Sequence, residues 1–133
     1  MIQAVVNELV DELIEFRRDI HAHPELSNAE HRTTEKIAQR LKDAGLEPVL
    51  FEGTGLYVDV GDGPIVGGLR ADIDALPLDD LTRTEFASTV PGVSHSCGHD
   101  VHLTAAMGAA LALSRIHETK GGLGGTIRCI FQP

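Results

Sequence analysis

Residues 95–102 place a thiol, three imidazoles and a carboxylate in one short run, His-Ser-Cys-Gly-His-Asp-Val-His. Thiolate, imidazole and carboxylate are the ligand types that hold zinc and the neighbouring transition metals in proteins. Gly98 leaves the backbone free to turn, so that Cys97 and His99 can point at one centre. A structural zinc finger would need a second Cys or His pair further along the chain, and none has that spacing. The run therefore predicts an open, catalytic type of metal site.

A pair of acidic residues, Asp72 and Asp74, lies at the carboxyl end of a predicted strand, where open α/β sheets place their ligands. In an extended backbone the two side chains share one face. Like carboxylates repel one another unless a cation lies nearby. By itself the pair is more typical of a turn or a helix cap. Beside the Cys-His run, we interpret the pair as part of the same metal site.

Composition excludes several classes of partner. The 133 residues suit one domain or part of one, and the formal net charge of −9 disfavours binding to DNA or RNA, which requires a basic face. The N-terminus does not have the pattern of a signal peptide, and no run is apolar enough to cross a bilayer. Two cysteines do not suggest a disulfide framework. We therefore expect a cytoplasmic protein with no nucleic-acid partner and no membrane association.

Apolar periodicity predicts three helices. The first begins at Ile2 and ends before the His23-Pro24 pair, because proline disfavours the helical conformation of the residue ahead of it. The second covers about 28–44, with Ser27 and Glu30 spaced as a capping box. The third runs through residues 105–113 and is closed by the glycines between 121 and 125.

Short β-rich segments are expected at 48–51, 56–60, 65–69 and 126–131. The turn sequence of residues 61–64, Gly-Asp-Gly-Pro, predicts a hairpin that joins the second and third of them. The order of helices and strands indicates an α/β fold with a mixed sheet flanked by helices.

Five segments of the chain, in order, resemble the N-terminal part of a family of metal-dependent amidohydrolases. The family includes hippurate hydrolases, N-acyl-amino-acid amidohydrolases and indoleacetyl-amino-acid hydrolases, within the aminoacylase and carboxypeptidase superfamily. Any one segment is a weak signal, but five in one order are highly specific. The segments are Arg17 to Leu26, Gly53 to Leu56, Leu69 to Pro77, His95 to His102 and Phe131 to Pro133.

The resemblance implies a role for each candidate site residue. Cys97 and His99 would be ligands of a centre of two divalent metal ions, with zinc, manganese, nickel and cobalt all open, and Cys97 would be the bridging thiolate. Asp74 would orient a metal-bound histidine. The role of Asp72 stays open, because it occupies the place of a metal-binding histidine in relatives with another ligand set. Supporting roles fall to Asp100, as a cap of the following helix, and to His102.

The resemblance also implies a reaction and a larger parent protein. Metal-activated water would hydrolyse the amide bond of a small N-acyl amino acid. The glutamate that serves the family as general base lies beyond Pro133. Residues 1–133 would thus be the N-terminal segment of a zinc-peptidase-like catalytic domain, without its C-terminal half or the lid and dimerisation domain. The parent would be roughly threefold longer. Its oligomeric state stays open, with a homodimer or a larger assembly among the options.

Two alternatives remain open from the residues alone. The chain could be a truncated, non-catalytic remnant with weak or no metal binding, since catalytic zinc sites usually need three protein ligands. Cys97 could instead be a nucleophile activated by one of the histidines at 95, 99 and 102, although that reading leaves the Asp72 and Asp74 pair without a role. We expect His21 and His23 to end the first helix and bond to neighbouring backbone, and Cys129 to be a core residue.

Overall fold

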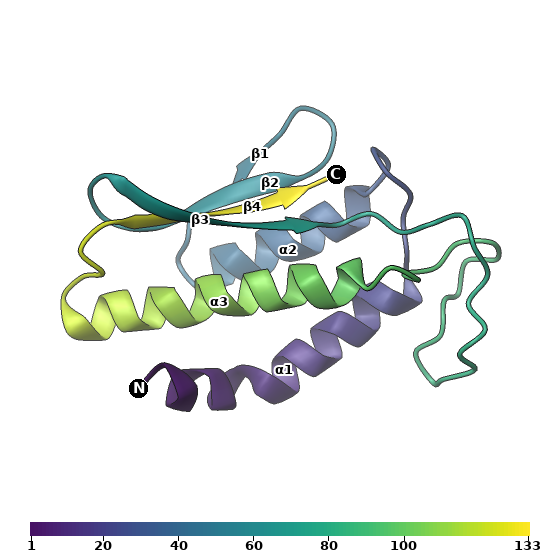
Figure 1. The fold of residues 1–133 in the computed structure, drawn as a ribbon, viewed down its shortest axis with the longest axis horizontal. Helices are drawn as coiled ribbons and strands as arrows, with labels where there is room; N and C mark the ends of the chain where they lie inside the picture. Colours follow the sequence, from purple (N-terminus) through teal and green to yellow (C-terminus); the bar gives the residue numbers. More distant parts are fainter.

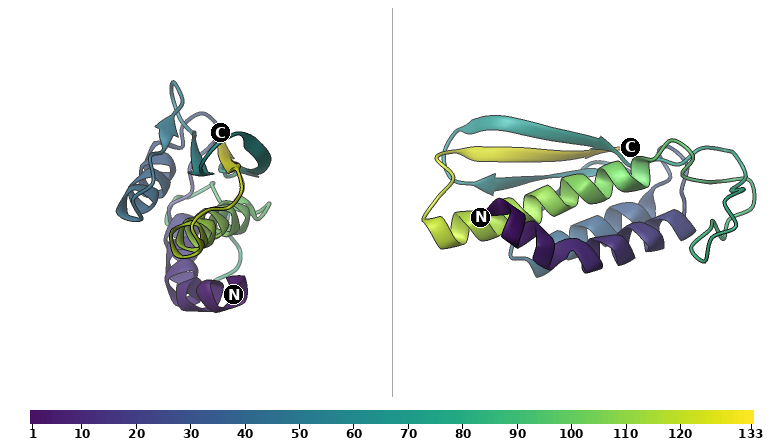
Figure 2. Two further views of the ribbon diagram at one scale, coloured as in Figure 1. Left: turned by 90° about the vertical axis from the view of Figure 1, so that its left-hand side faces the viewer. Right: turned by 60° about the horizontal axis from the view of Figure 1, so that its bottom comes forward.

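Three helices lie on one side of a four-stranded mixed sheet in the computed structural model, which describes all of residues 1–133 (Figure 1). Helix α3 runs directly beneath the sheet, and α1 packs against α3 on the side away from the strands (Figure 2). This confirms the predicted α/β class, with the helices on a single face. The elements are α1 (Ile2–Ala22), α2 (His31–Asp43), β1 (Val49–Leu50), β2 (Leu56–Gly61), β3 (Ile65–Asp72), α3 (His99–Lys120) and β4 (Thr126–Gln132).

The sheet has the order β1-β2-β4-β3, so the last strand of the chain lies between β2 and β3. Strand β4 is antiparallel to β2 and parallel to β3. The predicted hairpin of β2 and β3 is therefore wrong. The turn at 61–64 crosses the start of β4 instead, where the backbone N–H of Thr126 donates to the Pro64 carbonyl and its hydroxyl donates to the Gly63 carbonyl. A tight turn predicts a reversal of direction, but it does not dictate which strand fills the adjacent position.

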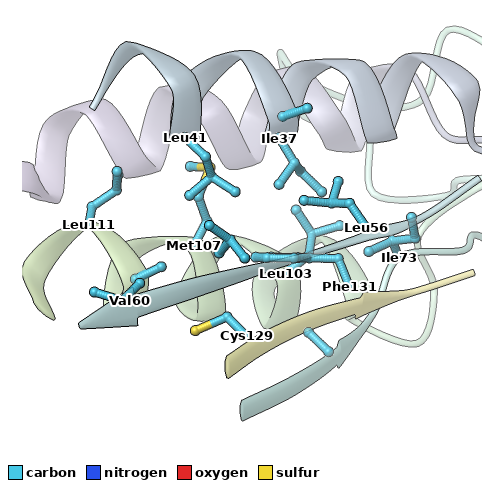
Figure 3. Close-up of a cluster of buried hydrophobic side chains, with 14 of the residues drawn as sticks. Ile37, Leu41, Leu56, Val60, Ile73, Leu103, Met107, Leu111, Cys129 and Phe131 are labelled. Carbon is cyan, nitrogen blue, oxygen red and sulfur yellow. The ribbon is translucent and has the colours of Figure 1, made fainter. Parts of the chain in front are cut away.

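The core lies between the sheet and the helices (Figure 3). Alternate residues of β2 point inward, as expected for a strand with one buried face. Full burial of a large apolar side chain contributes about 1.5–3 kcal/mol, so these contacts dominate the stability of the chain. Cys129 is a core residue, as predicted. Other large buried side chains of this layer include Ile37, Leu41, Leu56, Val58, Ile73, Leu103, Met107, Leu111 and Phe131.

The N-terminus of α2 is not held by the predicted capping box of Ser27 and Glu30. The Glu25 carboxylate accepts hydrogen bonds from the backbone N–H of Arg32 at 3.0 Å and of Thr33 at 2.6 Å. Glu30 is fully buried and accepts a hydrogen bond from the Thr54 hydroxyl. The segment ahead of α2 folds back on the helix, so a more distant carboxylate reaches the free N–H groups first.

The ends of the other helices follow the sequence more closely. Helix α1 ends at Ala22, just before the His23-Pro24 pair, as predicted. Helix α3 begins at His99, earlier than expected, after Gly98 adopts a left-handed φ of 84°. The potential metal-binding residues from His99 onward therefore lie in the first turns of a helix. No helix of the structure is long and apolar enough to span a membrane.

Candidate metal centre

The candidate site lies at the edge of the sheet where β3 and β4 end (Figure 1). Strand β3 ends at Asp72, and Asp74 follows directly. The chain then makes a long excursion over 75–98 and returns with Cys97 to the N-terminus of α3 at the same end of the molecule. Residues that are far apart in sequence are thus brought to one edge, as is common for ligand sites in α/β proteins.

His99 is the meeting point of the two predicted segments. Its Nδ1 atom lies 2.9 Å from Asp74 Oδ1 and 3.0 Å from the Asp74 carbonyl oxygen. Both oxygens are acceptors when the carboxylate is ionised, so Nδ1 donates in these contacts and Nε2 is left for another partner. The side chain is 15% exposed. This is the arrangement by which a carboxylate orients a histidine that binds a metal through its other nitrogen.

Asp72 lies on the opposite side of the same imidazole. Its Oδ2 atom is 3.7 Å from His99 Nε2, and its Oδ1 atom is 2.6 Å from the Arg70 guanidinium. The carboxylate pair therefore does converge on one histidine. Because a guanidinium already balances the charge of Asp72, this carboxylate is less available as a metal ligand than its position alone indicates.

Cys97 and His102 lie close to His99 in the chain but do not complete a set of metal ligands with it. Cys97 is a free, exposed thiol, and no hydrogen bond joins it to any histidine. The exposed His102 ring has its centroid 5.9 Å from that of His99. No group of three or more His, Cys, Asp and Glu side chains is arranged to hold a metal ion. The thiol and the oriented imidazole therefore fit part of a metal centre, two donors where a catalytic zinc site usually has three.

Asp100 does not cap α3, contrary to the sequence-based prediction. It is fully buried, and its Oδ2 atom accepts a hydrogen bond from Arg17 Nε at 2.8 Å and lies 2.7 Å from His21 Nδ1. His21 likewise bonds to carboxylates rather than to nearby backbone. The Arg17 guanidinium and the His21 ring take this carboxylate in place of the helix N–H groups, and the charge-assisted hydrogen bond from Arg17 is of the stronger kind. His23 does bond to backbone, at the Asp19 carbonyl, as predicted.

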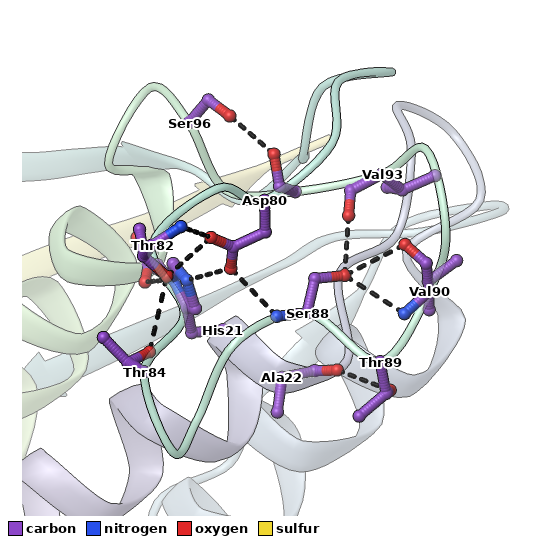
Figure 4. Close-up of polar contacts among 12 residues, drawn as sticks. His21, Ala22, Asp80, Thr82, Thr84, Ser88, Thr89, Val90, Val93 and Ser96 are labelled. Carbon is purple, nitrogen blue, oxygen red and sulfur yellow. Dashed lines mark hydrogen bonds and ion pairs between the residues drawn. The ribbon is translucent and has the colours of Figure 1, made fainter.

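Asp80 is a second buried carboxylate that the sequence analysis overlooked (Figure 4). It accepts hydrogen bonds from the Thr82 hydroxyl and N–H and from the Ser88 N–H, and its Oδ2 atom lies 3.0 Å from His21 Nε2. The hydrogen bonds from Thr82, followed by that from Ser88, hold the pKa of the carboxyl well below its usual range. The spacing of Asp80 and Thr82 is typical of an Asx turn and was the available signal.

His95 lies behind the candidate centre and is 5% exposed. Neither of its ring nitrogens has a hydrogen-bond partner, and burial lowers the pKa of the imidazole to about 4. The ring lines a polar cavity of about 550 Å³ together with Arg17, Asp79 and Ser96. The imidazole is thus neutral near pH 7, and its lack of a hydrogen bond to Cys97 gives no support to an activated cysteine nucleophile.

The two cysteines should differ sharply in reactivity. Cys97 is exposed, whereas Cys129 is buried in β4 and burial raises the pKa of its thiol to about 11. Because the thiolate is the reacting species, iodoacetamide should modify Cys97 in the folded chain and leave Cys129 unmodified until the chain is unfolded. Peptide mass spectrometry before and after denaturation measures this. Equal labelling of both residues under native conditions would contradict the placement of β4 in the core.

Comparison with known proteins gives the family of the chain. Residues 68–133, which include Asp72, Asp74, Cys97 and His99, match the description of peptidase family M20/M25/M40. The fold matches the crystal structure of the YXEP protein of Bacillus subtilis, a dinuclear metal-binding peptidase from the M20 family, with a TM-score of 0.84 and 40% identity. The chain belongs to the M20 peptidase family. That match covers 98% of this M20 chain and 36% of the other.

Curated relatives of the M20 chain agree with this assignment. An N-acetylcysteine deacetylase of Bacillus subtilis is 44% identical over 126 residues, which are 91% of this chain and 32% of the relative. A putative glutamate–cysteine ligase of Rhodococcus jostii is 52% identical over 125 residues, which are 91% of this chain but 15% of that protein. The M20 chain thus spans about a third of the length of the deacetylase and a smaller share of the length of the Rhodococcus protein.

Proposed function

We propose that residues 1–133 are the N-terminal segment of the catalytic domain of a longer M20 hydrolase that cleaves the amide bond of N-acyl amino acids. The observation that carries the proposal is the imidazole of His99, which Asp74 holds by Nδ1 while Nε2 stays available. Membership of the M20 family and the coverage of about a third of a deacetylase relative support the same reading.

In this proposal Cys97, through its thiolate, and His99, through Nε2, hold a divalent metal ion such as zinc, manganese, cobalt or nickel. Bound metal would polarise the substrate carbonyl and lower the pKa of the attacking water. Asp74 keeps the His99 tautomer and ring orientation, which raises the basicity of the ligating nitrogen. Asp72 and its partner Arg70 lie on the Nε2 side of the imidazole, opposite Asp74, and place charged groups beside the proposed site.

The remaining parts of the centre belong, in this proposal, to the longer protein. A general base, further ligands for two metal ions and a second domain over the substrate would come from the length that the relatives have and this chain does not span. The sheet edge at which Gln132 and Pro133 end lies beside Asp72, so the continuing chain would leave β4 directly at the site.

The experiment uses the protein that results when the reading frame continues past Pro133. The purified protein is assayed for amino-acid release from N-acetylcysteine, N-acetylmethionine and hippurate, before and after chelation and after return of each metal. We expect release that chelation abolishes and metal restores, with N-acetylcysteine, the compound in the name of the deacetylase relative, as the best of the three substrates. Hydrolysis that a chelator leaves unchanged would contradict the proposal.

A second candidate applies to the 133-residue chain by itself, as a non-catalytic segment with weak metal binding. It is favoured by the lack of a group of three or more ligand side chains. Titration of the isolated chain with Co²⁺, followed through the thiolate-to-cobalt absorption band, measures this affinity directly. Tight binding by the isolated chain would contradict this second candidate.

A further inference from the structure

His21 lies between two buried carboxylates. At the end of α1, its Nδ1 atom is 2.7 Å from Asp100 Oδ2. Its Nε2 atom is 3.0 Å from Asp80 Oδ2 (Figure 4). The side chains of His21, Asp80 and Asp100 are 7%, 4% and 0% exposed. The contacts are largely removed from solvent, so losing one of them leaves a buried polar group without that partner.

The two carboxylates belong to the two segments that carry the candidate ligands. Asp100 directly follows His99 in the first turn of α3, and Asp80 lies in the excursion that joins Asp74 to Cys97. One imidazole on α1 thus connects both segments to a helix that carries no candidate ligand. Nothing else in α1 bonds to both of them.

Carboxylate oxygens contact both ring nitrogens of His21, Nδ1 from Asp100 and Nε2 from Asp80. Arg17 is a second partner of Asp100, at the same Oδ2 atom. Removing His21 would leave two buried carboxylates beside a single guanidinium, and a buried ionic group that loses its partner is strongly destabilising. The excursion would be the first part of the chain to shift, because its backbone has little regular structure.

We propose that His21 is a positioning residue of the metal centre, which sets the place of His99 and of the segment leading to Cys97 by holding Asp100 and Asp80 at a fixed separation. The inference rests on the proposed function, since it assigns His21 a task at that site. It differs from a purely structural role, because it requires that the orientation of His99 against Asp74 depends on a residue of another helix.

The first measurement uses the 133-residue chain without metal, by ¹⁵N NMR of the histidine rings. In the parent chain we expect His99 as the Nδ1–H tautomer, held by Asp74. In His21→Asn the His99 ring should show a mixture of tautomers. His23→Asn is the matched control, because His23 is at the same end of α1 and bonds to Asp19 within its own helix. An unchanged His99 tautomer in a folded His21→Asn chain would overturn the proposal.

The second measurement uses the longer protein and Co²⁺ affinity, read from the thiolate-to-cobalt band. We expect about a tenfold loss in His21→Asn, the lower end of what loss of an orienting partner costs a metal site, and less than a threefold loss in His23→Asn. Asp80→Asn should give the same tenfold loss, and the double variant no more than either single one. Asp80→Asn also replaces His21→Asn if that variant fails to fold.

The two arms separate the possible failures. If the longer protein binds no cobalt, both the proposed function and the positioning role are wrong, even if the His99 tautomer changes in His21→Asn. A longer protein that binds cobalt equally in the parent, His21→Asn and Asp80→Asn forms would overturn the positioning role alone and leave the proposed function in place.

Discussion

Replacing His99 with alanine in the longer protein is expected to lower kcat/KM for an N-acyl amino acid by about a thousandfold, equivalent to ~4 kcal/mol of transition-state stabilisation. The reason is that the variant loses the imidazole nitrogen that Asp74 keeps available. Cys97→Ala should have an effect of the same size, because it removes the proposed thiolate ligand. Asp74→Asn should lower kcat/KM about 10- to 100-fold, since it disturbs the orientation of His99 while leaving both proposed ligands in place.

The matched control for Cys97→Ala is Cys129→Ala, which removes the other thiol of the chain from a buried position in β4. Its kcat/KM should stay within a few-fold of the parent, because Cys129 points into the core and not toward the carboxyl edge of the sheet. Steady-state kinetics and metal content per protein measure both variants. A His99→Ala protein with full activity and full metal content would contradict the assignment of His99 as a ligand.

Glu25→Ala is expected to lower the free energy of unfolding of the chain by about 3 kcal/mol. The Glu25 carboxylate accepts from two backbone N–H groups and one hydroxyl at the N-terminus of α2. Hydrogen bonds to a charged group contribute about 1.5–3 kcal/mol each, and they are not additive. Equilibrium unfolding in urea, followed by circular dichroism, measures the change.

Ser27→Ala is the matched control for Glu25→Ala, because Ser27 is the residue that the sequence pattern designates as the cap. In the structure Ser27 is exposed, and its hydroxyl meets the side-chain amide of Asn28 and no helix N–H group. Its replacement should change the free energy of unfolding by less than about 0.5 kcal/mol, as for an ordinary surface position. A loss of 1 kcal/mol or more in Ser27→Ala, with none in Glu25→Ala, would restore the capping box.

Much of the fold could be predicted because its signals are local. The apolar repeat of α1, the His23-Pro24 stop and the glycine that ends α3 act within a few residues of one another. The partner of each strand could not be predicted in the same way. The turn at 61–64 is present as its sequence predicts. However, β4, which begins more than sixty residues later, lies between β2 and β3 and pairs with both. Strand pairing is decided by long-range burial, which a local pattern does not contain.

The candidate site, too, could be predicted only in part. The sequence indicated that the segment around Cys97 and His99 and the acidic pair belong to one site. The structure brings Asp74 and Asp72 to opposite sides of the His99 ring. The tasks of the supporting residues could not be predicted. Asp100 has a good position for a helix cap, but Arg17 and His21 of α1 bind it instead. Such a choice depends on which charges are buried together.

By itself, the sequence determined the chemical types at the site, the class of fold and the ends of most helices, since these depend on side-chain identity and on spacing along the chain. Only the tertiary structure decided the strand order, the true cap of α2 and the buried cluster of His21, Asp80 and Asp100. The physical reason is that a buried polar group must find its partner wherever the fold provides one, and that partner is often distant in sequence.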